Sequence, residues 1–295
     1  MKFGVSIIYY NPSEVVLKRL EEYSKIFNFV FIADNSDNPK FDVRKELLRF
    51  PNVTYLSMKG NMGMSKAISA SVDWANDNSL DFLLTLDQDS LFDEINIRKM
   101  IDFIEANDDS SVGIYVANER KIYKDRKTGL NKFGKYCVPT NQIKSVSFCL
   151  TSTSFIRIKA INKIMPLTDY FISYVDNFIS YGLIEEGYKL LKVGNVQFNQ
   201  QIGESVYYNF FVDKLRIIHH KEIRYYYMAR NNRYFNDICK ERKLKFRNNL
   251  LFFHLILNIF LAESNKFKKI KAIKLGIKDY KNKVYGKLPD TRICW

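Results

Sequence analysis

The segment DFLLTLDQDS, Asp81–Ser90, joins a short apolar run to an acidic, polar end. The run has the length of a strand and stops at turn-forming residues, so it predicts a buried β-strand over Asp81–Leu86. Asp87 and Asp89 follow two residues apart, which directs both carboxylates to roughly the same side. Mg²⁺ and Mn²⁺ prefer such oxygen ligands and keep positions open for phosphates. The segment therefore predicts a strand that ends in a metal site; a capping turn without a ligand is the alternative.

Strand and helix patterns alternate on both sides of this segment. Continuous apolar runs predict further strands, and apolar residues at helical spacing predict helices between them. The expected strands are Phe3–Tyr10, Phe29–Ala33, Val53–Leu56 and Val112–Val116, and the expected helices include Met64–Ala75 and Ile95–Ile104. Buried strands that alternate with amphipathic helices indicate an α/β fold, with a mostly parallel central sheet flanked by helices.

Polar residues directly follow three of the expected strands. They are Asn11, Asp34, Asn35, Asp87 and Asp89. Because ligands of open α/β sheets bind beyond the carboxyl ends of the strands, we expect these five side chains to converge on one edge.

The composition of the 295 residues limits the class of protein. Hydrophobic residues make up 46%, which excludes a disordered chain. The formal net charge is +14, and residues 206–295 hold 21 Lys and Arg against 7 Asp and Glu, whereas residues 1–205 hold 25 of each kind. We therefore expect a neutral catalytic domain over 1–205 and a basic C-terminal region over 206–295 with an anionic partner; a solvated basic face is the alternative.

The sequence also bears on the compartment. The four cysteines lack the spacing of a disulfide framework or a zinc site, which favours reduced thiols. There is no signal-peptide pattern, and no apolar stretch reaches the roughly 18 residues that a spanning helix needs. We expect a cytoplasmic location, peripheral on the inner face of the cell membrane.

Two segments of the basic region suggest helices. Leu250–Ala262 is an apolar run that suits a buried or interfacial helix. In Lys266–Lys287, apolar residues form one stripe among lysines: Ile270, Ile273, Ile277, Tyr280 and Val284. This pattern is typical of a basic amphipathic helix on anionic lipid, although an ordinary helix that packs its stripe on the domain shows it too.

Several segments resemble motifs of the inverting glycosyltransferases of family 2, which have the GT-A fold. LDQDS (Leu86–Ser90) resembles their D-x-D-type motif, in the form of the bacterial rhamnosyltransferase branch. Seven more segments occur in the family's order: SIIYYNP (Ser6–Pro12), IADNSDN (Ile32–Asn38), NMGMSKAISAS (Asn61–Ser71), TSTSFI (Thr151–Ile156), FISYVDNF (Phe171–Phe178), NQQIGE (Asn199–Glu204) and IRYYYMARN (Ile223–Asn231). Together they span most of residues 3–231.

The resemblance implies a role for each matched residue. Asp87 would meet the ribose or the diphosphate, and Asp89 would hold Mg²⁺ or Mn²⁺ against the donor diphosphate. Asp176 would be the catalytic base that takes the proton of the acceptor hydroxyl, and a single displacement implies inversion. The nucleotide-diphospho-sugar would also be bound by Asp34 at its base and by Asn11, Asn35, Lys66, Gln200, Arg224 and Arg230.

Some positions depart from the family's pattern. Gln200 stands where the family often has a His that helps to bind metal or diphosphate, Thr153 replaces a Gly and Ser173 replaces an Asp. Of the adjacent His219 and His220, at most one can point into a site, because neighbouring residues of a helix face different directions.

These features predict an inverting transferase that moves L-rhamnose from dTDP-L-rhamnose to a hydroxyl of a lipid-linked glycan, in capsule, cell-wall or O-antigen synthesis. A UDP-hexose or UDP-galactofuranose donor stays open, and a homo-oligomer is compatible with the sequence. Two hypotheses come from other classes. One is a nucleic-acid-binding protein that uses the basic region, and the other is a catalytically silent family member that acts as an assembly subunit.

Overall fold

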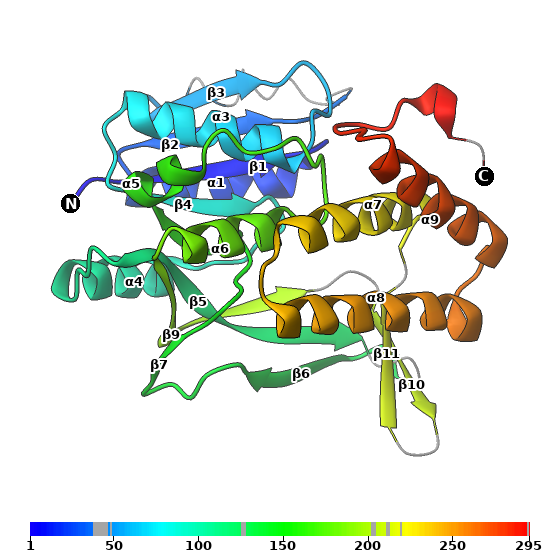
Figure 1. Ribbon diagram of the computed structural model, residues 1–295. Helices are drawn as coiled ribbons and strands as arrows, with labels where there is room; N and C mark the ends of the chain where they lie inside the picture. The colour runs from blue at the N-terminus through cyan, green and yellow to red at the C-terminus, as the bar shows by residue number, and fades with distance from the viewer. Residues whose placement is uncertain are drawn as a thin grey trace. The chain divides into compact units, whose positions relative to one another are not determined.

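Figure 1 shows the computed structural model, which describes residues 1–37, 47, 49–124, 128–201, 205–210, 213–218, 220–293 and 295. The chain forms two compact units. The first contains Met1–Glu119, Tyr136–Thr168 and Ile179–Asn199, and the second contains Arg120–Lys135, Asp169–Phe178 and Gln200–Trp295. The second unit therefore draws two segments from the part of the chain before residue 205.

The first unit is built around most of a sheet that has nine strands among the described residues. The strand residues that fall within 120–135 and 200–201 belong to the second unit. Its order is β3 (Val53–Ser57), β2 (Val30–Asp34), β1 (Phe3–Tyr9), β4 (Phe82–Asp87), β8 (Ser154–Arg157), β5 (Val112–Lys124), β9 (Lys189–Gln201) and β7 (Ile143–Ser145), and β6 (Asn131–Tyr136) pairs with β5. The first four strands are parallel, whereas β8 runs antiparallel to β4 and β5. The parallel part confirms the predicted α/β class, because its strands are the apolar runs of the first 90 residues.

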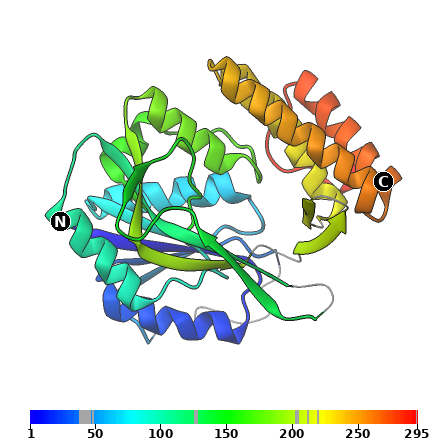
Figure 2. The same cartoon turned by 90° about the horizontal axis from the view of Figure 1, so that it is seen from below.

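Helices cover both faces of this sheet (Figures 1 and 2). α1 (Glu14–Ile26) and α4 (Glu94–Ala106) bury Leu20 and Met100 in the same cluster as Ile32. α3 (Met64–Asp77) covers the other face, where Trp74 stacks on Phe31 with 5.0 Å between ring centroids. Ile32 and Phe31 are neighbours on β2, so the strand is apolar on both sides because both sides are covered. Two short helices, α5 (Ile158–Ile161) and η1 (Asn162–Ile164), follow β8.

Three long helices form most of the second unit. They are α7 (Glu222–Ile238), α8 (Arg242–Ala262) and α9 (Lys266–Lys281), and the 3₁₀ turn η2 (Asp290–Arg292) follows them. The unit also contains the antiparallel hairpin of β10 (Ser205–Phe210) and β11 (Asp213–Ile218), and the start of α6 (Val175–Glu185). Gly276 lets α9 approach α7 closely, because a Cβ at this position would lie 2.4 Å from the carbonyl oxygen of Tyr226.

The apolar stripe expected on Lys266–Lys287 faces the core of the second unit. Ile273 is buried, and Ile270 and Ile277 pack against the same cluster as the tyrosines of α7. The helix itself ends at Lys281. The structure therefore bears out the second interpretation of this pattern, a helix that packs its stripe on the domain, because a buried stripe is not available to a membrane. No helix in the described part of the chain is long and apolar enough to cross a bilayer.

Candidate functional site

Gln88, the middle residue of the D-Q-D triplet, joins the ends of β1 and β4. Its side chain accepts a hydrogen bond from the Tyr10 N–H at 2.8 Å and donates one to the Tyr10 carbonyl at 3.1 Å. Arg19 of α1 donates to the Gln88 carbonyl oxygen at 3.1 Å. On either side of this fixed residue, Asp87 is half-buried and Asp89 is exposed. The two carboxylates therefore stand at the carboxyl edge of the sheet with their backbone anchored between them.

Asp34 ends β2 and organises the loop that follows. Its carboxylate is buried and accepts hydrogen bonds from the Ser36 N–H at 3.0 Å and from the Tyr55 hydroxyl at 2.6 Å. The Ser36 hydroxyl in turn accepts the N–H of Asn11 at 2.7 Å, and Asn11 has a left-handed φ of 47°. These bonds tie the loops after β1 and β2 together. The nucleotide contacts expected of Asp34 and Asn11 stay predictions.

Asn35 connects the same edge to the start of α3. Its Oδ1 accepts the Met62 N–H at 2.7 Å, and Asn61 Oδ1 accepts the Gly63 N–H at 3.1 Å. Gly63 has φ +87°, a conformation that glycine adopts without strain, and α3 begins directly after it. Lys66 lies exposed in the first turn of that helix. A helix N-terminus with a cation beside it favours anions, which suits the predicted phosphate contact.

The segment before β8 lies beside the end of β4. Ser152 accepts the Asp87 N–H at 3.2 Å, and its hydroxyl is hydrogen-bonded to that of Ser90. Thr153 has φ +64°, which a β-branched residue rarely adopts. Its buried hydroxyl has no hydrogen-bond partner among the residues that the structure describes. The left-handed φ gives a physical reason for the glycine that the family has here.

The carboxylates at this edge fit a hard divalent cation that is bound together with a diphosphate. Asp87 and Asp89 supply oxygen ligands at the end of β4. Within the described ranges, no cluster of three or more His, Cys, Asp or Glu could hold a metal ion. Mg²⁺ commonly takes one or two carboxylates and completes its shell with water and phosphate oxygens. The residues present therefore suit an open site and not a closed protein cage.

Two buried tyrosines lie close to this edge. Burial is the main cause that raises the pKa of Tyr9, at the end of β1, and the nearby Tyr23 and Asp34 raise it further. Burial likewise raises the pKa of Tyr23 to about 12. Both rings therefore stay neutral at physiological pH.

Asp176 lies in the second unit, in the first turn of α6, and is half-buried. The backbone that leads to it is unusual. Phe171, Ser173 and Tyr174 have φ values of +64°, +65° and +67°. A left-handed conformation costs a residue other than glycine on the order of 1 kcal/mol, and it persists only where the surroundings impose it. The segment before Asp176 is therefore held in a strained shape.

Asn231 of α7 holds this strained segment. Its buried side-chain amide donates to three backbone carbonyl oxygens, those of Tyr170 at 2.9 Å, Ile172 at 2.8 Å and Ser173 at 3.0 Å. The next residue, Asn232, donates to the Tyr174 hydroxyl at 2.9 Å. The path of the chain into Asp176 thus depends on two adjacent amides of α7, which the sequence analysis did not single out.

Arg230 is fully buried next to Asn231. Its guanidinium donates to the carbonyl oxygens of Tyr170 at 3.0 Å and Gly286 at 2.9 Å, and its Nε donates to Asn231 Oδ1 at 3.0 Å. The group also lies 5.1 Å from the ring centroid of Tyr227. The predicted contact of Arg230 with a donor diphosphate is not supported, because its donors are used inside the core. Its position indicates a structural role.

The remaining predicted residues also lie in the second unit. Arg224 is half-buried in the first turn of α7. The Oε1 of Gln200 is buried and has no hydrogen-bond partner among the described residues, so this oxygen could accept from a ligand or bind a cation. The His220 ring lies 6.1 Å from that of Tyr225, whereas His219 is outside the described residues.

The candidate residues thus fall into two sets. One edge of the first unit brings together Asn11, Asp34, Asn35, Lys66, Asp87 and Asp89, and the second unit contains Asp176, Gln200, Arg224 and Arg230. Gln88 and Ser152 belong to the first set but were not expected. The sequence does mark Gln88, because it is an amide between two acids at the end of a predicted strand. It gives no such mark for Ser152, because this residue reaches Asp87 only through the pairing of β8 with β4.

Solved glycosyltransferase structures share the fold of this chain. S. aureus TarS is 13% identical over 99% of this chain and 50% of its own, with a TM-score of 0.59. The mannosyltransferase PcManGT from Pyrobaculum calidifontis, in complex with GDP-Man and Mn²⁺, is 11% identical over 94% of this chain and 73% of its own, with a TM-score of 0.55. GalNAc-T7 with UDP, GalNAc and Mn²⁺ is 16% identical over 68% of this chain and 43% of its own, with a TM-score of 0.51. The chain spans half or less of TarS and GalNAc-T7, and at these identities the likeness shows the fold alone.

The sequence itself shows the family. No curated protein sequence matches the chain. The model of glycosyl transferase family 2 matches residues 5–165, which is more than half of the chain and contains the D-Q-D triplet and all six candidate residues of the first unit. The chain therefore belongs to glycosyl transferase family 2 and has the GT-A fold.

Proposed function

We propose that this chain transfers L-rhamnose from dTDP-L-rhamnose to a hydroxyl of a lipid-linked glycan, with inversion, in the synthesis of a cell-surface polysaccharide. The carrying observation is the pair of carboxylates, Asp87 and Asp89, on either side of the anchored Gln88 at the carboxyl edge of a GT-A sheet. Two solved structures with this fold contain Mn²⁺ together with UDP or GDP-Man, which supports a nucleotide-sugar donor. The choice of rhamnose follows from the LDQDS form of the motif.

Asp89 would hold Mg²⁺ or Mn²⁺, which when bound offsets the charge of the departing diphosphate, and Asp87 would meet the ribose or the diphosphate. Lys66, in the first turn of α3, adds a positive charge at the same edge. The carboxylates suit this role because one is exposed and the other half-buried, so water and phosphate oxygens can reach them.

Asp176 acts as the base in this proposal. Its carboxylate takes the proton of the acceptor hydroxyl while that oxygen forms a bond to the anomeric carbon, and the bond from that carbon to the diphosphate oxygen breaks. The electron pair of the broken bond leaves with the nucleoside diphosphate. One displacement inverts the configuration. The rigid backbone before Asp176 suits a base that must keep one direction.

The test of the base is Asp176→Asn, with Asp290→Asn as a matched control on an exposed carboxylate of the same unit. We expect Asp176→Asn to lose transfer by about a hundredfold or more, because general-base catalysis contributes that much, while nucleotide binding persists. Asp290→Asn should transfer normally. Full activity of Asp176→Asn would sink the assignment.

A panel of nucleotide sugars tests the donor. Thermal shifts with dTDP-rhamnose, UDP-hexoses and UDP-galactofuranose, each with and without Mn²⁺, identify the ligand that binds the folded state, because binding raises the melting temperature. The largest shift with dTDP-rhamnose would support the proposal. A larger shift with a UDP-sugar would identify that sugar nucleotide as the donor and would leave the proposed reaction unchanged. A shift that neither a chelator nor Asp89→Ala reduces would rule out the metal role.

A further inference from the structure

α8 has two apolar sides, and only one of them is used by the core. Phe252 and Ile259 are 6% and 0% exposed and belong to the cluster of α7 and α9. The opposite side, here called the outer face, consists of Phe246, Leu250, Phe253, Leu257, Phe260 and Leu261. These residues recur every three or four positions, so they line one side of the helix. Their exposed fractions run from 39% for Leu257 to 70% for Phe246.

Such a continuous apolar surface needs a partner. Single exposed apolar residues are ordinary on soluble proteins, but contiguous patches mark interaction sites or membrane contacts. Phe267, at the start of α9, adds a ring that is 88% exposed close in sequence to the C-terminal end of the outer face. The three phenylalanines of the outer face and Phe267 are each more than half exposed, so they contribute little to the core of the unit.

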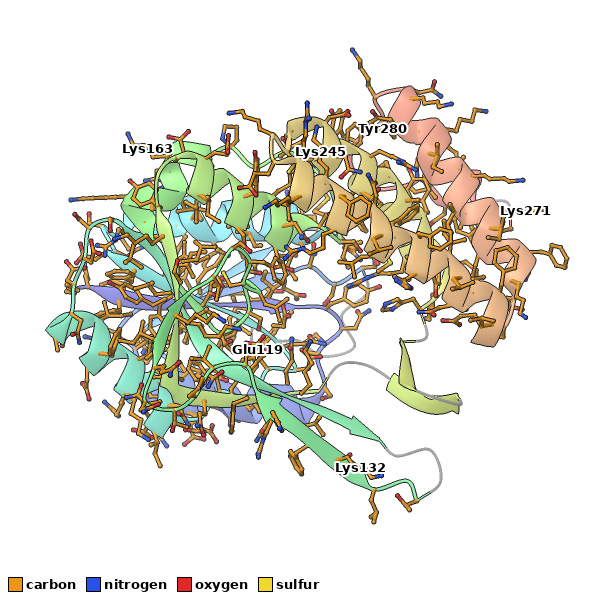
Figure 3. The ribbon with its side chains drawn as sticks, turned by 60° about the horizontal axis from the view of Figure 1, so that its bottom comes forward. Glu119, Lys132, Lys163, Lys245, Lys271 and Tyr280 are labelled. Atoms are coloured by element: carbon orange, nitrogen blue, oxygen red, sulfur yellow. The ribbon has the colours of Figure 1, made fainter. Side chains whose placement is uncertain are left out.

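Basic residues surround the outer face. α8 carries four positive side chains before its apolar run, namely Arg242, Lys243, Lys245 and Arg247, and no Asp or Glu occurs in its 21 residues. Arg242 and Lys243 precede Phe246 by four and three positions, so they lie on the same side of the helix. α9 continues the charge with Lys266 and Lys268 beside Phe267, and Lys271 extends outward from it (Figure 3).

We propose that the outer face of α8 docks the protein on an anionic lipid bilayer. Apolar rings that enter the boundary between headgroups and acyl chains, with cations that meet anionic headgroups, are the two features that such binding uses. The helix lies along the surface and does not cross it, because its other side stays in the core of the unit. The lysine-rich stripe of α9 contributes charge, but its apolar side is buried.

The charge favours lipid over the two other occupants that an apolar face can have. In a symmetric pair of chains this face would meet itself. Because α8 contains no Asp or Glu, the α8 of a second copy would offer no carboxylate to Arg242 or Lys243, whether the two helices ran parallel or antiparallel. A single-stranded nucleic acid stacks its bases on aromatic rings, whereas half of the outer face is leucine. The proposal does not rest on the proposed activity, since vesicle binding needs neither donor nor acceptor.

The test is co-sedimentation of the full chain with vesicles, either phosphatidylcholine mixed with phosphatidylglycerol or phosphatidylcholine alone. The variant Phe246→Ser/Phe253→Ser/Phe260→Ser removes three rings of the outer face. Phe133→Ser is the matched control, because Phe133 is 51% exposed on β6 of the same unit. We expect wild type and control to bind the anionic vesicles, and the triple variant to partition at least about tenfold less.

A second variant tests the charge. Arg242→Gln/Lys243→Gln should lower binding to the anionic vesicles by about fivefold for each residue, and raised salt should act in the same direction. If the triple phenylalanine variant fails to fold, as judged by its circular dichroism melting curve, Leu250→Gln/Leu257→Gln replaces it with smaller changes on the same face.

Three results would overturn the proposal. The first is sedimentation of a folded outer-face variant as strongly as the wild type. The second is a wild-type dimer in solution that the variant converts to a monomer without any vesicle binding, which would make the face an interface between copies. The third is binding to oligonucleotides in a gel-shift assay with no affinity for vesicles.

Discussion

Replacing Asn231 with alanine removes the donor that holds the backbone before Asp176. The buried amide of Asn231 reaches the carbonyl oxygens of Tyr170, Ile172 and Ser173 within 2.8–3.0 Å. Alanine has no side-chain donor, and the position is 0% exposed, so water does not replace it without local opening. The carbonyls of Ile172 and Ser173 lose this donor, whereas that of Tyr170 keeps the Arg230 guanidinium and the Ile172 N–H. The buried Arg230 Nε also loses its acceptor, Asn231 Oδ1. The strained residues of the segment thus lose part of what fixes their shape.

The size of the effect follows from these bonds. A buried polar group left without its partner costs about 1–3 kcal/mol. Asn231→Ala takes a partner from three such groups, the carbonyl oxygens of Ile172 and Ser173 and the Nε of Arg230. Release of the left-handed Phe171 and Ser173 returns part of that cost, on the order of 1 kcal/mol for each. We therefore expect the free energy of unfolding to fall by about 3 kcal/mol. A relaxed segment also shifts the start of α6, and a displacement of about 1 Å at a catalytic group can cost a hundredfold in rate.

Two assays separate these effects. Urea unfolding measures the stability of the variant, and transfer assays well below its unfolding temperature measure kcat at saturating donor. Asn236→Ala is the matched control. Asn236 is a half-buried amide of the same helix, and its side chain bonds to those of Asn232, Asn248 and Asn249 and not to the carbonyl oxygens that Asn231 serves. We expect that control to lose less than about 1 kcal/mol and to keep its activity.

The results can refute either half of the reasoning. A stability loss below 1 kcal/mol in Asn231→Ala would mean that the three bonds do not hold the segment. A large stability loss with a wild-type kcat would mean that the strained shape does not direct Asp176, and it would leave Asn231 with a structural role only.

Three further predictions concern other parts of the chain. Gly276→Val should destabilise the second unit by about 3 kcal/mol or unfold it, since any Cβ there meets the α7 backbone; thermal melting would show this, and a melting point within a degree or two of wild type would contradict the close crossing. Alkaline pH should lower the free energy of unfolding. Burial raises the pKa of Tyr23 and of Tyr227 to about 12, so the native state keeps protons that the unfolded state has already lost above its pKa of about 10. The contribution is therefore complete below pH 10 and is lost as the pH rises toward 12, and urea unfolding at several pH values, with tyrosinate absorbance, should show the decline. Tyr55→Phe removes the hydroxyl that donates to the buried Asp34 carboxylate, which should cost about 1.5–3 kcal/mol in urea unfolding; a loss of a few tenths would mean that water or Ser36 suffices.

The parallel half of the sheet could be predicted from the sequence because β1, β2 and β4 are buried along most of their length and so are continuous apolar runs, and the partly exposed edge strand β3 still carries Val53 and Leu56. Each of the four apolar runs before residue 90 matches a strand to within one residue at either end. The polar residues after those runs were located correctly for the same reason, since parallel strands end at a common edge. The antiparallel pairing of β8 with β4 carries no comparable signal, and neither does the position of Ser152 that depends on it.

The second unit shows what sequence patterns cannot decide. In the sequence, Arg230 resembles a cation that binds a ligand. In the fold its guanidinium donates to the carbonyl oxygens of Tyr170 and Gly286, two residues that are distant from it in the sequence. The apolar stripe of α9 is compatible in sequence with contact to lipid or to the core. The structure shows that it packs against α7 in the core of the second unit. α8 is apolar on both sides, so only the fold shows which side the core uses.

The bonds from Asn231 to the segment before Asp176 also impose an order on biosynthesis. Tyr170 precedes Asn231 by 61 residues, so a ribosome that adds about 5–20 residues per second makes the donor several seconds after the acceptor. Gly286, whose N–H donates to the Asp169 carbonyl at 2.7 Å, is made later still. During that delay, the hydrogen bonds from Asn231 that hold the three left-handed residues, Phe171, Ser173 and Tyr174, have not yet formed. The proposed catalytic base would thus take its shape after the edge formed by β1, β2 and β4, and a nascent chain would have that edge before it has a working base.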